Sequence, residues 1–351
     1  MINSKGKTAE NRFIRYFVQF IHPALYRFHS RHYLRSTFKK RFMKKLRKTI
    51  KWTVITLLVI IGGLAIIVVA RQDIKYEAPY PNITASTDSA IIARGKHLVY
   101  SSAHCIDCHN KQNSDSLIHL GQEVPLSGGV VFELPLGKIY SKNITPDKST
   151  GIGSYSDGEI ARALRYGVHP NGIAVFDFMP FHNTSDEDLT AIISYLRAQK
   201  PVNNKVPNHE LNAIGMAVNA FMIKPVGPTG EVPKSVERDT TAVYGKYLAL
   251  SVAECSGCHT KRNLAGEFIG EPFAGGNEID GFITPNLTPD SSGKIFNWGK
   301  EMFIERFRMG KLIPKSPMPW NSFKRMTDDE LTAIYHFIKT LKPVNTAEVK
   351  K

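Results

Sequence analysis

The sequence repeats itself once, and the repeat decides how the folded part of the chain divides. Residues 94–98 (RGKHL) return as residues 244–248 (YGKYL), and residues 186–192 (DEDLTAI) return as residues 328–334 (DDELTAI). The offset shrinks from 150 to 142 positions along the repeat, as expected if loops differ in length between matching elements. Such a duplication predicts two domains of the same fold. We place them at residues 88–203 (the first half) and residues 237–347 (the second half).

Both halves are predicted to be mostly α-helical. Apolar residues recur at helical spacing through residues 90–101 and 242–251, just before the first cysteine of each half. Ser156 opens a capping box for a helix that stops at Gly167. The last helix of each half should start at Ser185 or Thr327 and end before Pro201 or Pro343. No segment shows the alternating pattern of a strand, so no sheet is expected.

The N-terminal region carries the excess charge and the longest apolar run. Of the 46 Lys and Arg residues, 15 lie in residues 1–51 beside a single acidic residue, and the rest of the chain is nearly neutral. A nucleic-acid-binding domain would carry its basic surface on the folded part, so this charge does not indicate nucleic acid. Residues 52–70 contain no charged residue and are long enough to cross about 30 Å of hydrocarbon. They predict a transmembrane helix.

The basic block before this run sets its orientation. Lys and Arg stay on the cytoplasmic side, so residues 1–51 are predicted to be a cytoplasmic tail. The two halves would then lie in the periplasm, attached to a bacterial inner membrane. The tail either lies on the anionic inner leaflet or is disordered. A cleaved signal peptide ending at Ala70 is the alternative, although the basic region is far longer than signal peptides carry.

Two connecting segments complete the chain. Residues 71–87 are predicted to be a tether, and residues 204–236 a linker between the halves. The linker contains an apolar stretch, residues 211–223, that we expect to form a helix packing across both domains. This stretch is too short and too polar for a second membrane span.

All four cysteines fall in one pattern, C-x-x-C-H, which occurs once in each half. This pattern is the attachment signature of c-type haem. Two thiols on a tight turn can each add to one vinyl group of the porphyrin, and the adjacent histidine then supplies a nitrogen to the iron. We therefore predict two covalently attached haem c groups. The attachment residues are Cys105, Cys108 and His109 in the first half and Cys255, Cys258 and His259 in the second.

Other uses of the cysteines fit less well. A thioredoxin-like pair needs no following histidine and expects alternating strands and helices. Structural disulfides would be spread through the fold. A zinc site built from both pairs would leave the repeated histidine without a role.

The second axial ligand of each iron is predicted to be a methionine. Met179 and Met318 occupy equivalent positions, 70 and 59 residues after the haem histidines, and each is followed by proline and an aromatic residue. A lone methionine is usually a core residue, but recurrence at one place in both halves favours a ligand. Met216, Met222, Met302, Met309 and Met326 do not recur in this way and are expected in the core or linker. The remaining histidines that follow the predicted span do not recur either, and we expect them to be surface or structural residues.

Ligation by histidine and methionine indicates electron transfer. It fills both axial positions and raises the reduction potential, so no open site remains for oxygen or peroxide. Two further features recur. Gly95 and Gly245 suit close helix–helix approach, with Tyr195 and Phe337 as expected neighbours. The N-x-T-P-D loops either reach the haem propionates or form ordinary Asx and proline turns.

These motifs resemble the class I cytochrome c family, and more closely the cytochrome c subunits of membrane-bound alcohol, gluconate and sugar dehydrogenases. The resemblance covers about residues 90–345 and rests on C-x-x-C-H, N-I-T-P-D, T-G-I-G and Met-Pro-aromatic in that order. It implies a mostly α fold of two tandem cytochrome c domains, each a three-helix haem-wrapping fold, behind one N-terminal transmembrane helix. Those subunits commonly carry three haems and a C-terminal anchor, whereas this chain has two motifs and an N-terminal span. Iron would be held by His109, Met179, His259 and Met318.

The expected function is electron transfer between a dehydrogenase and the respiratory chain, without catalysis of its own. The expected partners are redox proteins, either a dehydrogenase or a terminal oxidase or reductase, together with membrane lipid. Neither nucleic acid nor a small-molecule substrate is expected. The alternative is a dihaem enzyme such as a cytochrome c peroxidase, which needs one open axial position.

Overall fold

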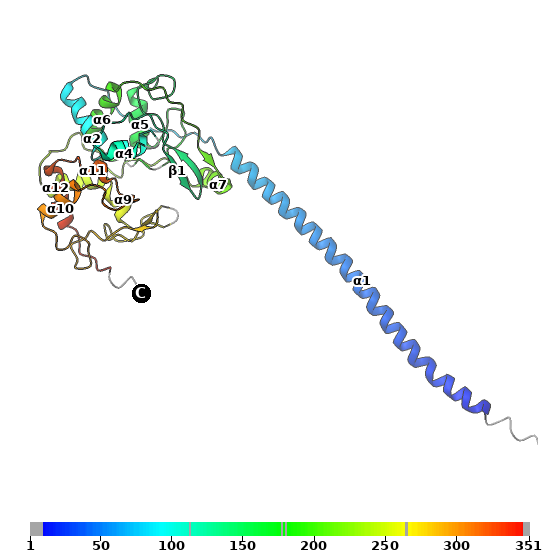
Figure 1. The fold of residues 1–351 in the computed structure, drawn as a ribbon. Coiled ribbons are helices and arrows are strands. Elements are labelled where there is room, and N and C mark those ends of the chain that lie inside the picture. Colours follow the sequence, from blue (N-terminus) through cyan, green and yellow to red (C-terminus); the bar gives the residue numbers. More distant parts are fainter. Residues whose placement is uncertain (1–9, 112–113, 177, 180, 264–265, 347–351) are drawn as a thin grey trace, which may run out of the picture. The chain divides into compact units, whose positions relative to one another are not determined.

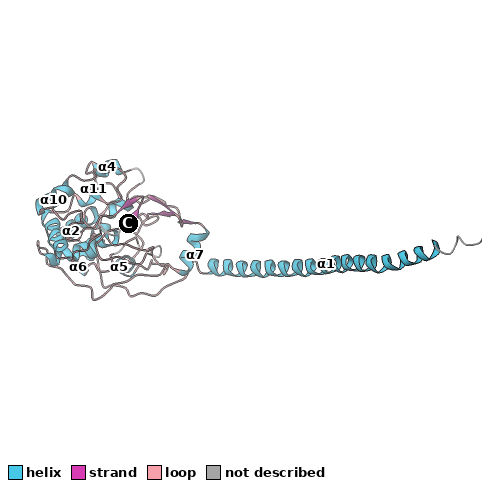
Figure 2. Cartoon of the chain, turned by 90° about the horizontal axis from the view of Figure 1, so that it is seen from below, coloured by secondary structure: helices cyan, strands magenta, loops and turns pink. Residues whose placement is uncertain are grey.

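The computed structural model describes residues 10–111, 114–176, 178–179, 181–263 and 266–346 of the 351-residue chain. The chain divides into two compact units, Met1–Ile67 and Val68–Lys351. Helices predominate in the described part, and the strands are few and short (Figure 2). The mostly α-helical composition predicted from the sequence is therefore confirmed.

The first unit consists of helix α1, Glu10–Ala70, which continues into the first residues of the second unit. Its backbone is helical from Glu10 onward, so the described part of the predicted tail is helical. The segment Lys39–Ala70 is long and apolar enough to cross a membrane, with a mean hydropathy of 2.9 in its most apolar window and side chains exposed. The helix is therefore compatible with the membrane anchor predicted at residues 52–70.

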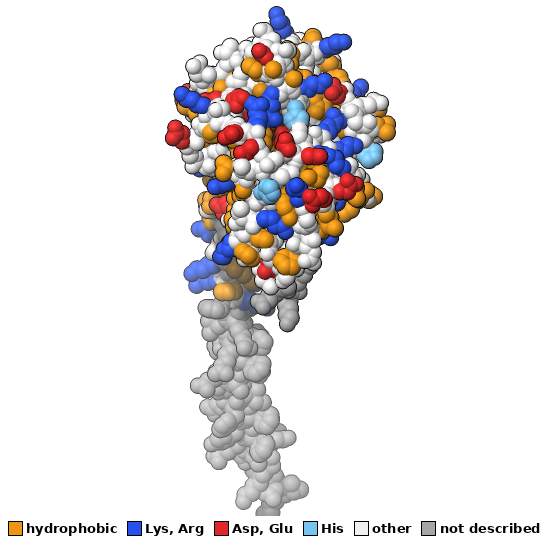
Figure 3. Space-filling view, turned by 90° about the vertical axis from the view of Figure 1, so that its left-hand side faces the viewer, with side chains coloured by type: hydrophobic (Ala, Val, Ile, Leu, Met, Phe, Trp, Pro, Cys, Tyr) orange, Lys and Arg blue, Asp and Glu red, His pale blue; other side chains and the backbone are white. Residues whose placement is uncertain are grey.

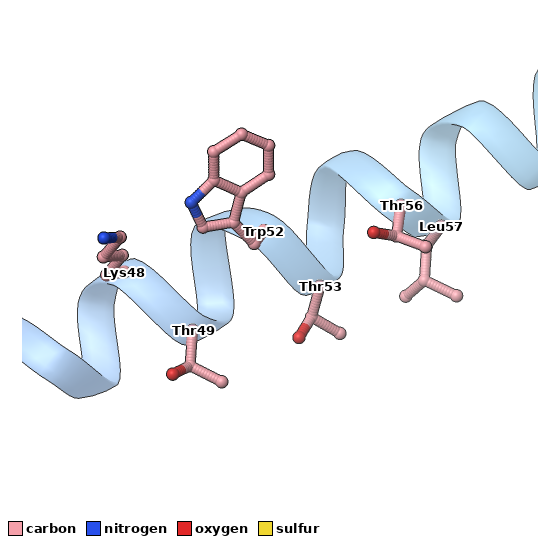
Figure 4. Close-up of a pocket in the computed structure, with 6 residues that line it drawn as sticks. All are labelled: Lys48, Thr49, Trp52, Thr53, Thr56 and Leu57. Carbon is pink, nitrogen blue, oxygen red and sulfur yellow. The ribbon is translucent and has the colours of Figure 1, made fainter.

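The start of the apolar run on α1 has a mixed surface. Six side chains line a shallow, open depression here, and Lys48 and Trp52 project from the same side of the helix (Figure 4). An indole beside a lysine is typical of the level at which a helix meets lipid headgroups. All six side chains come from successive turns of this one helix.

The second unit contains the helices of both halves, which lie side by side (Figure 1). In the first half they are α2 (Ser89–Tyr100), α3 (Cys105–His109), α4 (Asp115–His119), α5 (Asp157–Tyr166) and α6 (Asp186–Ala198). In the second half they are α8 (Ala242–Tyr247), which continues as a π-helix (Leu248–Val252), then α9 (Cys255–His259), α10 (Lys300–Arg308), α11 (Trp320–Phe323) and α12 (Asp328–Lys339).

The helix ends follow the capping signals in the sequence. Ser156 and Thr327 form complete capping boxes at the starts of α5 and α12, and the Ser185 side chain accepts from the backbone of Asp188 at the start of α6. Gly167 takes the left-handed conformation that ends α5. The predicted starts of these three helices and the end of α5 are confirmed, whereas α6 ends at Ala198 and α12 at Lys339, shortly before the predicted Lys200-Pro201 and Lys342-Pro343.

The expectation of no strands is wrong. Strands β1 (Val131–Leu134), β2 (Gly137–Tyr140) and β3 (Glu210–Leu211) form an antiparallel sheet in that order, and β4 (Glu278–Ile279) pairs with β5 (Phe282–Ile283). Strands of two to four residues are too short for an alternating pattern to stand out. One signal was nevertheless present: Asp280-Gly281 between apolar residues is a strong hairpin turn, and both residues have positive φ, 49° and 77°.

The connecting segments both pack on the first half. In the predicted tether the Tyr76 amide donates to the Gly172 carbonyl oxygen at 2.9 Å, and Ile83 is buried. The linker helix α7 (Ala213–Phe221) follows β3, which pairs with β2, and Gly215 lies against the Leu136 carbonyl. The helix expected to pack across both domains therefore packs on the β1–β2 hairpin of the first half.

Each half is built around one close helix pair. Helix α2 crosses α6, and helix α8 crosses α12, with a glycine at the contact in both cases. A Cβ on Gly95 would lie 1.8 Å from the Ala191 carbonyl oxygen, and one on Gly245 would lie 1.9 Å from the Ala333 carbonyl oxygen. The close approach predicted for both glycines is confirmed, but the nearest atoms are helix backbone in both cases. The expected neighbour Tyr195 follows at 2.9 Å from a Cβ on Gly95, whereas the nearest atoms to a Cβ on Gly245 belong to Ala333 and Ile334 and not to the expected Phe337.

We expect Gly95→Ala and Gly245→Ala to destabilise the protein. Each methyl group would overlap a backbone carbonyl and force the helix pair apart, at about 1–3 kcal/mol or more of unfolding free energy. Gly158→Ala in α5 is the matched control, because its Cβ meets nothing closer than 3.7 Å and alanine favours a helix. Denaturant unfolding of the purified chain measures all three. Equal stability of Gly95→Ala and Gly158→Ala would contradict the packing described here.

Candidate haem sites

The two C-x-x-C-H motifs occupy equivalent one-turn helices, α3 and α9. Each helix starts after a residue in the left-handed conformation, His104 with φ 40° and Glu254 with φ 48°. Non-glycine residues rarely adopt such a conformation, and where they do a functional site is often near. The sequence carried no signal for this turn, because neither histidine nor glutamate marks it.

The motif histidines are oriented in the same way in both halves. His109 Nδ1 lies 2.7 Å from the Lys142 carbonyl oxygen, and His259 Nδ1 lies 3.0 Å from the Pro285 carbonyl oxygen. A carbonyl can only accept, so Nδ1 carries the proton and donates it. The other ring nitrogen, Nε2, then keeps its lone pair, which is the state in which histidine binds a metal.

Burial shifts the pKa of the cysteines and histidines in the same direction in both halves. It lowers the pKa of His109 and His259, against a smaller opposite effect of the carbonyl hydrogen bond, so both imidazoles are neutral at pH 7. Burial also raises the pKa of Cys105 and Cys255 to about 12, and both partner thiols shift upward as well. None of the four cysteines, all of them in described segments, forms a disulfide. Protonated thiols and neutral imidazoles fit a haem c site.

A double glycine, missed in the sequence, closes each site. The Gly128 amide donates to the His109 carbonyl oxygen at 2.8 Å, and the Gly275 amide does the same for His259 at 2.8 Å. Both glycines have positive φ, and a Cβ on Gly128 would lie 2.5 Å from the Lys142 carbonyl carbon. Only glycine lets these loops approach closely enough. The repeat of Gly128-Gly129 in Gly275-Gly276 was the signal that could have revealed them.

The N-x-T-P-D loops are buried turns. Asn143 accepts from the amide and hydroxyl of Thr145 and donates to the Val202 carbonyl oxygen at 2.8 Å. Asn286 makes the equivalent contacts with Thr288 and Val344. Of the two roles considered for these loops, the structure therefore displays the Asx turn. Each turn starts at the residue directly after the carbonyl that orients the motif histidine, and its asparagine bonds that segment to the end of its half.

The predicted methionine ligands lie in matching local structures. Met179 and Met318 are partly buried against the hydrophobic core that Cys105 and Cys255 also contact. In both places the aromatic residue two positions later donates its amide to the methionine carbonyl oxygen, at 2.9 and 2.8 Å. Pro319, with φ −75° and ψ 58°, forms an inverse γ-turn between them. The ligand role of Met179 and Met318 stays a prediction.

Comparison with known proteins is consistent with this geometry. No family model matches the chain. The gluconate 2-dehydrogenase cytochrome c subunit of Pantoea cypripedii is 28% identical over 281 residues, covering 72% of this chain and 60% of its own length. The cytochrome c subunit of alcohol dehydrogenase (quinone) from Gluconobacter oxydans (strain 621H) is 30% identical over 281 residues, covering 73% of this chain and 56% of its own length. The chain is a homologue of cytochrome c subunits.

A third relative bears on the number of haems. A diheme cytochrome c-type protein of Cereibacter sphaeroides is 27% identical over 213 residues, covering 56% of this chain and 67% of its own length. These relatives confirm the resemblance drawn from the motifs, and a cytochrome c by definition carries haem c. The chain nevertheless spans only 60% or less of the first two relatives' length.

In this cytochrome homologue a buried network of charged and hydroxyl groups joins the two halves. Arg94 bonds Asp188 of its own half at 3.0 Å and Glu330 of the other half at 3.2 Å. His97 lies 2.9 Å from Glu330, and the Tyr247 hydroxyl donates to Asp188 at 2.9 Å. His97 and Tyr247 are equivalent positions of the repeat, as are Asp188 and Glu330. The interface is therefore pseudo-symmetric, since each half offers an acid to the same position of the other.

Glu330 is held as a carboxylate in this network. Burial alone would raise its pKa, but the hydrogen bond and charge of His97, the Thr327 amide and the charge of Arg94 outweigh it, so the pKa lies below the ordinary 4.5. A depressed pKa means that the ionised form stabilises the folded state at neutral pH. That contribution is lost as the pH falls through the depressed value.

We expect Glu330→Gln to lower the free energy of unfolding at pH 7 by roughly 3 kcal/mol, because it removes the buried carboxylate that pairs with Arg94 across the two halves. The difference in the free energy of unfolding between the variant and the unchanged protein should persist down to about pH 4.5 and disappear below it. Glu123→Gln is the control, since its ion pair with Lys96 is exposed and worth about 0–1 kcal/mol. Denaturant unfolding at several pH values tests this, and a gap that widens on acidification would refute it.

Proposed function

We propose that the chain is a membrane-anchored dihaem c-type cytochrome that carries electrons between a dehydrogenase and the respiratory chain. The observation that carries the proposal is the equivalent setting of His109 and His259, each buried, each donating from Nδ1 to a backbone carbonyl, and each directly after a C-x-x-C pair. On this proposal residues 88–203 and 237–347 are two tandem cytochrome c domains. Each would hold one haem.

The residues of each site divide the work of holding haem c. The paired cysteines would attach the porphyrin, and the histidine nitrogen and the thioether of Met179 or Met318 would bind the iron. When bound, such a haem takes up and releases one electron with little rearrangement of its ligands. The backbone carbonyls of Lys142 and Pro285 fix the plane of each imidazole, and so help to keep the ligand geometry the same in both oxidation states.

Electron transfer is favoured over catalysis because the two halves match. Their cysteine turns, histidine bonds, double glycines and methionine turns are equivalent. A dihaem peroxidase needs one half with an open axial position, and this equivalence gives no reason to expect one. A dihaem peroxidase remains the alternative function. In a peroxidase one iron would bind external ligands, whereas in an electron-transfer cytochrome neither iron would.

The relatives' names support a dehydrogenase as electron donor, since the two longest matches described here are subunits of gluconate and alcohol dehydrogenases. The chain's own surface suits modest steering of such a partner. Lys and Arg side chains are interspersed with Asp and Glu on the face in Figure 3, and the chain outside residues 1–51 is nearly neutral. Association with the partner should therefore depend only weakly on salt.

Helix α1 supports the membrane anchor, with residues 1–51 in the cytoplasm and both haems in the periplasm. The apolar side chains of residues 52–70 are exposed on the helix, and surrounding lipid would remove them from water. The lysines and arginines before Trp52 favour this orientation.

We expect two covalently bound haems per chain after expression in a host that matures c-type cytochromes. Replacing Cys105 and Cys108 by serine should leave one haem, as should replacing Cys255 and Cys258, because each thiol pair attaches its own porphyrin. Ser256→Ala, between two of these cysteines, is the control and should keep both. The haem-to-protein ratio and haem staining of denatured protein measure this. Unchanged protein without covalent porphyrin would end the proposal.

Met179→Ala and Met318→Ala should each remove about half of the methionine–iron charge-transfer band and lower the potential of one haem, since a thioether ligand raises it. Met302→Ala, an exposed methionine of the second half, is the control and should leave the band intact. Spectroscopy of the oxidised protein and a redox titration measure these effects. Peroxide turnover by the unchanged protein, or a band that survives in Met179→Ala, would favour the dihaem enzyme.

A further inference from the structure

Helix α7 exposes an apolar face on the second unit. Ile214 is 64% exposed, Phe221 47% and Met222 50%, and with Val218 they form one stripe at helical spacing. No charged residue occurs between Leu211 and Ile223. Such a stripe on a surface helix marks a face that contacts something other than water.

The polar and apolar side chains of α7 are placed in the opposite way to those of an ordinary surface helix. Its polar side chain, Asn219, points into the protein and donates to the backbone and side-chain oxygens of Gln72 at 3.3 and 3.1 Å. Its buried positions are the small Gly215 and Ala220. Polar and small residues therefore face the protein while large apolar ones face outward, the reverse of the usual pattern.

The protein side of α7 is bound to the residues that follow the apolar run of α1. Arg71 donates to the Ala220 carbonyl oxygen at 2.9 Å, and its guanidinium lies 5.3 Å from the Phe221 ring centroid. Gln72 donates to the Met216 carbonyl oxygen at 2.9 Å and to the Val68 carbonyl oxygen at 2.8 Å. Val68 and its neighbours belong to the same compact unit as α7. The exposed stripe is thus tied to the end of the predicted span.

We propose that α7 lies in the interfacial layer of the periplasmic leaflet, with Ile214, Phe221 and Met222 inserted between lipids. This inference rests on the proposed membrane span of α1, which ends in Ala70 and places Arg71 at headgroup level. A helix hydrogen-bonded to Arg71 and Gln72 is held at that same level. Apolar side chains at that level are buried at the boundary between headgroups and acyl chains, and this burial stabilises the contact with the membrane. The cytochrome then has a second attachment to its own membrane.

Charge at the rim favours lipid over a protein partner. Arg71 at one edge and Lys224 just beyond the helix are cations beside the apolar stripe, and Lys224 is exposed. Long basic side chains at such an edge suit phosphate headgroups while their stems stay along the apolar surface. A second copy of the chain would bring identical cations together at this edge.

Lipid photolabelling of the full haem-loaded chain tests the inference. The chain is reconstituted into phosphatidylethanolamine–phosphatidylglycerol vesicles that contain a lipid with a carbene precursor near the headgroup end of its acyl chain. After irradiation, lipid adducts are located by proteolysis and mass spectrometry. We expect adducts on residues 52–70 and on α7, the latter at least tenfold above the peptide with Leu312 and Ile313, which are 58% and 52% exposed in the second half.

A variant sharpens the test. Ile214→Ser with Phe221→Ser should reduce labelling of α7 several-fold and leave residues 52–70 labelled, with haem content and spectrum unchanged because both side chains are exposed. Val243→Ser, at a 76% exposed position of α8, is the matched control and should change nothing.

The outcomes separate the two proposals. Labelling of residues 52–70 without α7 overturns the interfacial helix and leaves the span intact, and cross-linking between chains through α7 would identify a second copy as its occupant. Equal labelling of α7 and the Leu312–Ile313 peptide overturns the inference as well, because it would reflect general adsorption. If residues 52–70 stay unlabelled, the membrane span itself fails, and the inference fails with it.

Discussion

The arrangement of each half depends on one backbone contact, where a glycine of the first helix meets a carbonyl of the last. The turn with the paired cysteines follows the first helix, and the Met-Pro-aromatic turn precedes the last. Contact of Gly95 with Ala191, or of Gly245 with Ala333, therefore packs the helix that leads into the cysteine turn against the helix that follows the Met-Pro-aromatic turn. The same contact also carries Asp188 and Glu330, one turn away, into the interface between the halves.

Much of this could be predicted because it is local or repeated. Capping boxes at Ser156 and Thr327 gave helix starts, and the repeat pointed to Gly95 and Gly245. The double glycines and the Asp280-Gly281 turn were visible in the sequence too, but the strands beside that turn are two residues long and leave no alternating pattern. The charged network between the halves could not be predicted from the sequence. Arg94 has partners at positions 188, 244 and 330, and no spacing rule connects residues that meet only when two halves pack.

The two sites share a backbone frame but differ in electrostatics. Asp107 stands between the cysteines of the first half and adds to the upward shift of the pKa of Cys108, whereas Gly257 holds that place in the second half. There Arg262 acts on Cys258 in the opposite sense, although burial still dominates. If each site holds a haem as proposed, this unequal local charge would give the two haems different reduction potentials while their ligands stay the same.

Two equivalent positions of the repeat contact each other at the interface between the halves: Arg94 donates to the hydroxyl of Tyr244 at 3.3 Å. In a dimer of identical lobes that place would hold either two guanidinium groups or two phenols facing each other. Joining the two lobes in one polypeptide removes this restriction, because positions 94 and 244 are separate residues of the sequence and can differ. A cation can then lie opposite a neutral phenol, which two identical lobes could not provide at that place.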